Sequence, residues 1–133
     1  AATGGTLSEI RAARIELATA IDSATRALDP TLAPAGIPSA LLEAAGAQFA
    51  GEYGRVLDLL QNQRFRDRRM EGQRHLFIAA AAYNLFQLGG GTDESLRSLA
   101  EANVKRSLDS DPEIEPSLST FSPRFLLFFQ ANQ

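Results

Sequence analysis

The segment 67–88 constrains the fold most strongly, because its second half is apolar on nearly every side of a helix. A helix with one apolar stripe covers a core, whereas a helix that is apolar all round lies inside it. The apolar part, 76–88, is shorter than the roughly 20 apolar residues that cross a membrane, and it contains Asn84 and Gln87. We therefore expect a buried central helix, whose alanine run at 79–82 lets a neighbouring helix approach closely.

The other segments also carry a helical pattern. Apolar residues recur at intervals of three and four, which is the period of one helix face, and glycine or proline separates the segments. No segment alternates apolar and polar residues as a strand does. The sequence predicts an all-α fold with helices at 7–28, 39–50, 52–62, 67–88, 93–110 and from 123 onward.

Several polar residues stand where helix N-caps are expected. Thr6 and Glu9 form a capping box ahead of the first helix. Gly51 leaves so short a turn that the helices on either side must pack as an antiparallel hairpin. The expected N-caps of later helices are Ser39, Thr92 and Ser122.

Length and composition indicate one domain and exclude several classes of site. The 133 residues, 44% hydrophobic and 22% charged, are enough for one core, so we expect a single helical domain over 1–133 with a flexible start at 1–6. The net charge of −3 gives no general attraction to nucleic acid or to an acidic membrane. Because the chain has no cysteine, it has no disulfide, thiolate nucleophile or cysteine-bound metal.

Two short motifs resemble the tetratricopeptide family. Gly51-Glu52-Tyr53 resembles the turn between the two helices of its repeat, and the segment 105–112, which ends in Asp-Pro, resembles its repeat ending. A shortened version of that ending is at 27–30, and small residues stand where the family packs helices tightly, at Ala45, Gly46 and Ala82. The resemblance covers 39–112 and implies a right-handed stack of antiparallel helical hairpins with capping helices at both ends.

The sequence also departs from the tetratricopeptide pattern. The turn at 89–94 is longer than usual, no tryptophan occurs, and 63–65 lacks the Asp-Pro ending. The segment 121–125 resembles an ending found in bacterial envelope proteins with such helical domains. That resemblance and the lack of cysteine favour a periplasmic or exported setting over a cytoplasmic one, and the compartment stays open.

No catalytic, metal or cofactor site is predicted. His75 is the only histidine, and a catalytic base also needs a partner and a pocket. The acidic run 109–115 lacks the glycine and glutamate of an EF-hand loop, and Gly89-Gly90-Gly91 lacks the lysine of a phosphate-binding loop. We expect a non-enzymatic chain; the alternative is a small α-helical enzyme or ligand carrier with a pocket near His75.

Two groups of residues are candidates for binding a protein or peptide partner, including a second copy of the chain. Basic residues gather at 64–74, where Asp67 and Glu71 offer local ion pairs, although positive charge opposes the dipole at a helix N-terminus. The C-terminal phenylalanines either cap the core or form an exposed apolar patch. The candidate residues are Arg64, Arg66, Arg68, Arg69, Arg74, Phe125, Phe128 and Phe129. The expected function is a protein-interaction or scaffold module, or a structural subunit of a larger bacterial envelope assembly.

Overall fold

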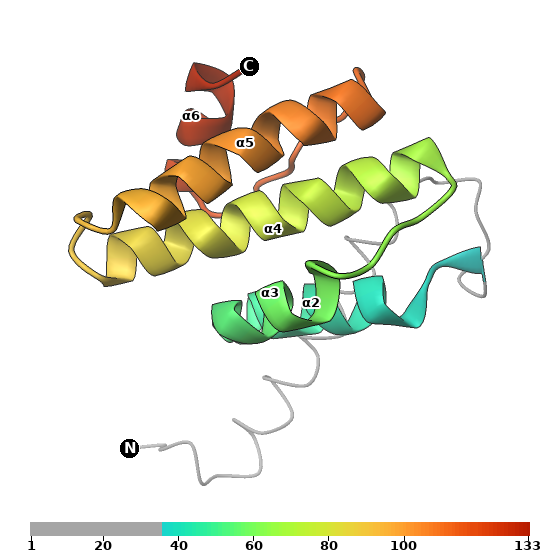
Figure 1. Cartoon of the computed structure of the whole chain (residues 1–133), viewed down its shortest axis with the longest axis horizontal. Helices are drawn as coiled ribbons and strands as arrows, with labels where there is room; N and C mark the ends of the chain where they lie inside the picture. The colour runs from blue at the N-terminus through green and yellow to red at the C-terminus, as the bar shows by residue number, and fades with distance from the viewer. Residues whose placement is uncertain (1–35) are drawn as a thin grey trace, which may run out of the picture.

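A computed structural model of the chain describes residues 36–133, so the helix expected at 7–28 and its capping box lie outside the described residues. Over 36–133 every regular element is a helix, which confirms the predicted all-α class. Figure 1 shows their arrangement. The helices are α2 (Ser39–Phe49), α3 (Tyr53–Leu60), α4 (Arg68–Leu88), α5 (Glu94–Ser110) and α6 (Pro123–Ala131).

Helix α4 lies at the centre of the described fold. It runs antiparallel to α5, while α2 and α3 form the expected hairpin against another side of it (Figure 1). Helix α6 packs against α4 as well. No helix within 36–133 has both the length and the apolar character needed to span a bilayer.

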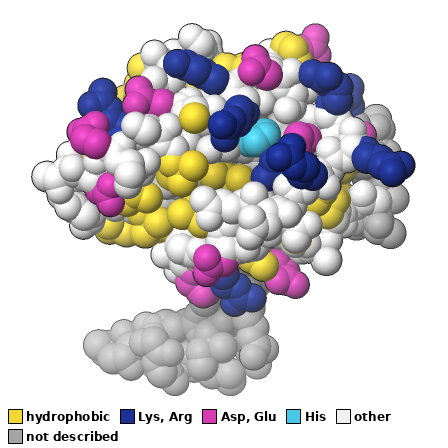
Figure 2. All heavy atoms as spheres, in the orientation of Figure 1, with side chains coloured by type: hydrophobic (Ala, Val, Ile, Leu, Met, Phe, Trp, Pro, Cys, Tyr) yellow, Lys and Arg dark blue, Asp and Glu magenta, His cyan; other side chains and the backbone are white. Residues whose placement is uncertain are grey.

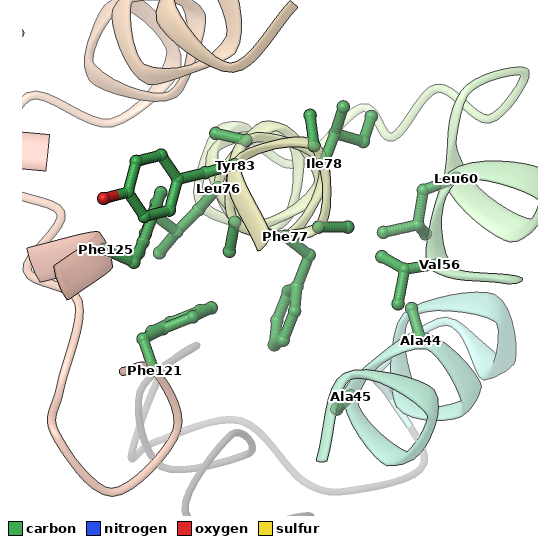
Figure 3. Packing of buried hydrophobic residues seen from close by; sticks show 14 of the residues in the cluster. Ala44, Ala45, Val56, Leu60, Leu76, Phe77, Ile78, Tyr83, Phe121 and Phe125 are labelled. Atoms are coloured by element: carbon green, nitrogen blue, oxygen red, sulfur yellow. The ribbon is translucent and has the colours of Figure 1, made fainter. Parts of the chain in front are cut away.

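The side chains of α4 enter the core in several directions, as the sequence predicts for a helix that is apolar all round. Figure 3 looks along this helix: Phe77 points between Phe121 and the α2–α3 hairpin, and Tyr83 points toward Phe125 of α6. The ring centroids of Phe77 and Phe121 are 5.2 Å apart. Apolar side chains thus join α4 to helices on opposite sides of it.

Small residues of α4 let neighbouring segments approach this helix closely. Ala79–Ala82 are all fully buried. Near the start of α4, a Cβ added at Gly72 would lie 2.9 Å from the Cβ of Asp111 and 3.2 Å from the carbonyl oxygen of Ser107. Gly72 therefore lies at a contact where even a methyl group would displace the C-terminal end of α5.

We expect Gly72→Ala to destabilise the domain. Alanine gains about 1 kcal/mol of helix propensity, but overpacking of this kind costs about 1–3 kcal/mol, and the clashing Asp111 Cβ is fixed to its backbone. Gly54→Ala in α3 is the matched control, because nothing lies within 4 Å of its added Cβ. Urea unfolding of both variants measures the difference. A Gly72→Ala protein as stable as the Gly54→Ala protein would contradict the close contact.

The helix ends agree with the predicted caps at one position and differ at two. The hydroxyl of Ser122 accepts a hydrogen bond from the Phe125 amide, as predicted. Ser39 is inside α2 and makes no capping bond; Pro38 precedes the helix, and its carbonyl accepts from the amides of Leu41 and Leu42. Asp93, not Thr92, caps α5, because its carboxylate accepts from two amides of the first turn.

Candidate functional site: a groove lined by arginine and amide side chains

An open groove of about 630 Å³ lies where the segment after α3 meets α4 and α5. Most of its lining is polar, with two apolar side chains among the nine that form it. Figure 2 shows the histidine at the surface of this face with Lys and Arg side chains beside it. The lining residues are Gln61, Asn62, Arg64, Arg74, His75, Ile78, Leu99, Asn103 and Arg106.

Arg74 is buried and, together with Glu71, links α4 to the end of α3 and to the segment that follows α3. Its Nε and Nη2 donate to the two carboxylate oxygens of Glu71, at 2.6 and 2.9 Å. Its Nη1 donates to the carbonyl oxygen of Leu60 at the end of α3, at 2.9 Å. Glu71 also accepts from the backbone amide of Phe65, at 3.3 Å. This pair therefore holds both ends of the segment that carries Gln61, Asn62 and Arg64.

His75 is bonded on both ring nitrogens. The amide of Asn103 donates to the Leu99 carbonyl at 2.9 Å, so its oxygen is the acceptor that faces His75 Nδ1 at 2.8 Å. Nδ1 therefore carries the proton. Nε2 then accepts from Nη2 of Arg74 at 3.3 Å. The Asn103 and Arg74 contacts favour the neutral tautomer with its proton on Nδ1, while Oε2 of Glu71 lies 3.4 Å from the same Nε2.

The electrostatic surroundings also favour the neutral ring. Burial lowers the pKa of His75, and the positive charges of Arg74 and Arg106 lower it further, against the opposing effects of the Asn103 hydrogen bond and the Glu71 charge. The pKa of Glu71 is lowered too, first by its hydrogen bond from Arg74. Near pH 7 the network thus contains a carboxylate, a guanidinium and a neutral imidazole.

Stability is expected to fall as the pH drops below about 6.5, the ordinary pKa of histidine. Because the folded pKa of His75 is the lower one, the unfolded chain binds more protons in the window beneath 6.5. The stability contribution of His75 is therefore fully present above that window. Within the window the free energy of unfolding declines by at most about 1.4 kcal/mol per pH unit for one proton.

Urea unfolding at a series of pH values between 7.5 and 5 measures this decline. Glu71 and Asp93 have lowered pKa values as well, but they lose their contributions only below their ordinary values of 4.5 and 3.8. His75→Gln is the control, since His75 is the only histidine of the chain. An equal decline in that variant would show that another group titrates.

The arginines expected to bind a partner are placed in different ways. Arg64 is exposed and lines the groove, whereas Arg66 and Arg69 are exposed outside its lining. Arg68 donates from Nη2 and Nε to the last carbonyls of α5, those of Asp109 at 2.7 Å and Ser110 at 3.1 Å. Its charge thus meets the negative end of the antiparallel α5, which explains a cation at the α4 N-terminus.

The C-terminal phenylalanines do not form an exposed patch. Phe125 and Phe129 are buried, at 0% and 2% exposure, and Phe128 is partly buried against Tyr83, with ring centroids 4.5 Å apart. Binding by these three residues remains a prediction, and burial of two of them leaves the exposed arginines as the accessible candidates. The exposed large side chain of α6 is Leu127.

The sequence reasoning missed the part of the groove contributed by α5. Asn103 is buried and Arg106 is exposed, and both lie on one helix face with Leu99 at spacings of four and three. The available signal was Asn103, a polar residue directly beside the apolar stripe residue Val104. Gln61 and Asn62 follow α3 and carry no periodic signal.

The arrangement is suited to binding more than to proton transfer. Four of the five N–H donors of Arg74 are used inside the protein, and both nitrogens of His75 are occupied. The side chains of Arg64 and Arg106 make no hydrogen bond or ion pair with another residue of 36–133. No group of three or more acidic or histidine side chains in that range is placed to hold a metal ion.

Comparisons with protein families, with curated proteins and with solved structures give no match to this chain.

Proposed function

We propose that the chain is a non-enzymatic protein-interaction module, and that it binds its partner in the groove beside His75. The observation that carries this proposal is the pair of exposed arginines, Arg64 and Arg106, which line a groove and have no partner within 36–133. Arginine is enriched among the residues that contribute most binding energy in protein interfaces. The occupied ring nitrogens of His75 support a structural role for that residue.

The wider proposal is a tetratricopeptide-like module that serves as a scaffold or structural subunit of a larger bacterial envelope assembly. The antiparallel α2–α3 and α4–α5 hairpins and the turn at Gly51, with a φ of 79°, are compatible with it. The right-handed stack, the repeat relationship, self-association and the envelope setting are parts of this proposal.

The second candidate is a carrier of a small ligand, and the groove volume of about 630 Å³ favours it, since small-molecule sites occupy a similar range. Such sites are mostly apolar with a few polar groups. Here Ile78 and Leu99 are the apolar part of a lining that is otherwise polar or charged. The composition of the groove therefore supports a macromolecular partner over an enclosed small molecule.

Selection from a random peptide display library on the immobilised full chain tests the proposal. We expect enrichment of related sequences whose binding is lost in Arg106→Glu and kept in Lys105→Glu, because Lys105 is the exposed neighbour outside the groove. If the folded chain enriches no peptide, or if Arg106→Glu and Lys105→Glu behave alike, the groove is not a protein-binding site.

A further inference from the structure

We propose that the segment bound in this groove is acidic, with Asp or Glu carboxylates held between Arg64 and Arg106; this inference rests on the proposed function. Both guanidinium groups are exposed, come from different parts of the chain and line the same groove. A guanidinium presents parallel N–H donors that match the two oxygens of a carboxylate.

The buried arginine of the groove, Arg74, is already neutralised within the protein. Arg74 is paired with Glu71 through both carboxylate oxygens, so its charge is balanced within the protein. The charges of Arg64 and Arg106 have no such acid, and no acidic side chain lines the groove. The groove is therefore locally positive on a chain whose net charge is −3.

The other lining groups suit an extended peptide. Gln61 and Asn62 are exposed amides that can donate to carboxylates or to backbone carbonyls and accept from backbone amides. Leu99, which is half-buried, offers apolar surface in the groove, whereas Ile78 is only 3% exposed. This combination fits an acidic segment with an apolar residue among its carboxylates.

The segments that carry Arg64 and Arg106 are held in place by bonds within the protein before a ligand binds. Arg64 stands in a short segment fixed at Leu60 by Arg74 and at Phe65 by Glu71. Arg106 lies on α5, and Asn103 of the same helix is bonded to His75 of α4. A rim that is ordered in advance loses less conformational freedom on binding.

Fluorescence anisotropy with the full chain tests the inference. The probes are labelled peptides of one length, rich in Glu, in Gln or in Lys around a central leucine, together with any peptide selected from the display library. We expect the Glu-rich peptide to bind and the Gln-rich and Lys-rich peptides not to bind. Added salt should weaken the binding, as for exposed charges.

Two double variants separate the groove from general charge. Arg64→Gln/Arg106→Gln should raise the Kd of the Glu-rich peptide at least tenfold, which corresponds to about 1.4 kcal/mol. Arg55→Gln/Lys105→Gln removes the same two charges from exposed positions outside the lining, and it should change the Kd by less than about threefold. Circular dichroism of both variants checks that their helices are retained.

The other results overturn the inference in distinguishable ways. Equal losses in the two double variants would mean that general charge, not the groove, attracts the peptide. Groove-dependent binding of a neutral or basic selected peptide would overturn the inference and leave the proposed function intact. Binding of citrate or inorganic phosphate without binding of any peptide would overturn both, in favour of a small-anion carrier.

Discussion

Arg74→Ala is expected to destabilise the domain by about 3–5 kcal/mol, the range found when one partner of a buried ion pair is removed. The change leaves the Glu71 carboxylate, with 18% side-chain exposure, without its guanidinium partner and leaves the Leu60 carbonyl without its donor. The loss is a large share of the total stability of a domain, about 5–15 kcal/mol. Urea unfolding followed by circular dichroism at pH 7 measures it.

Two further variants keep this prediction testable even if Arg74→Ala does not fold. Arg74→Lys retains the charge but has a single nitrogen, which cannot make the four bonds of the guanidinium, so it should lose stability while remaining folded. Arg66→Ala removes an exposed arginine and should change the free energy of unfolding by less than about 0.5 kcal/mol. If Arg74→Lys matches the wild type, the bond network does not stabilise the fold.

Phe125→Ala is expected to destabilise the domain by about 3–5 kcal/mol, as other buried phenylalanine truncations do. Phe125 is 0% exposed and lies in ring contact with Phe121 at 5.4 Å and Tyr83 at 6.0 Å between centroids. Its removal leaves a cavity between α6 and α4. The change in urea midpoint at constant slope measures the loss.

Leu127 is the matched control for that truncation because it lies in the same helix and is 67% exposed. Leu127→Ala should stay within about 0.5 kcal/mol of the wild type. Similar effects of the two truncations would mean that α6 does not use Phe125 to attach to the core.

Sequence patterns predicted the helices well because local chemistry determines where a helix lies. The alanine run and its apolar flanks identified α4 as the central helix, and the Asp-Pro pair at 111–112 identified the end of α5. The errors at Ser39 and Thr92 have a local cause as well: each has a neighbour, Pro38 or Asp93, that occupies the capping position instead.

The groove was only half predictable. Arg64 and Arg74 stand in a visible basic cluster, but His75 meets Asn103 across 28 positions of sequence. That contact depends on the register between α4 and α5, and the close contact of Gly72 with Ser107 and Asp111 constrains this register. The spacing of side chains along one helix does not reveal this register, so the part of the groove that α5 contributes could not be predicted from the sequence.

The central position of α4 affects how the domain unfolds. In a linear repeat array each unit touches its neighbours alone, and units can be lost or duplicated one at a time. Here α2, α3, α5 and α6 all pack on one shared helix. Detaching any of them would expose apolar surface of α4, so we expect residues 36–133 to unfold in a single cooperative step.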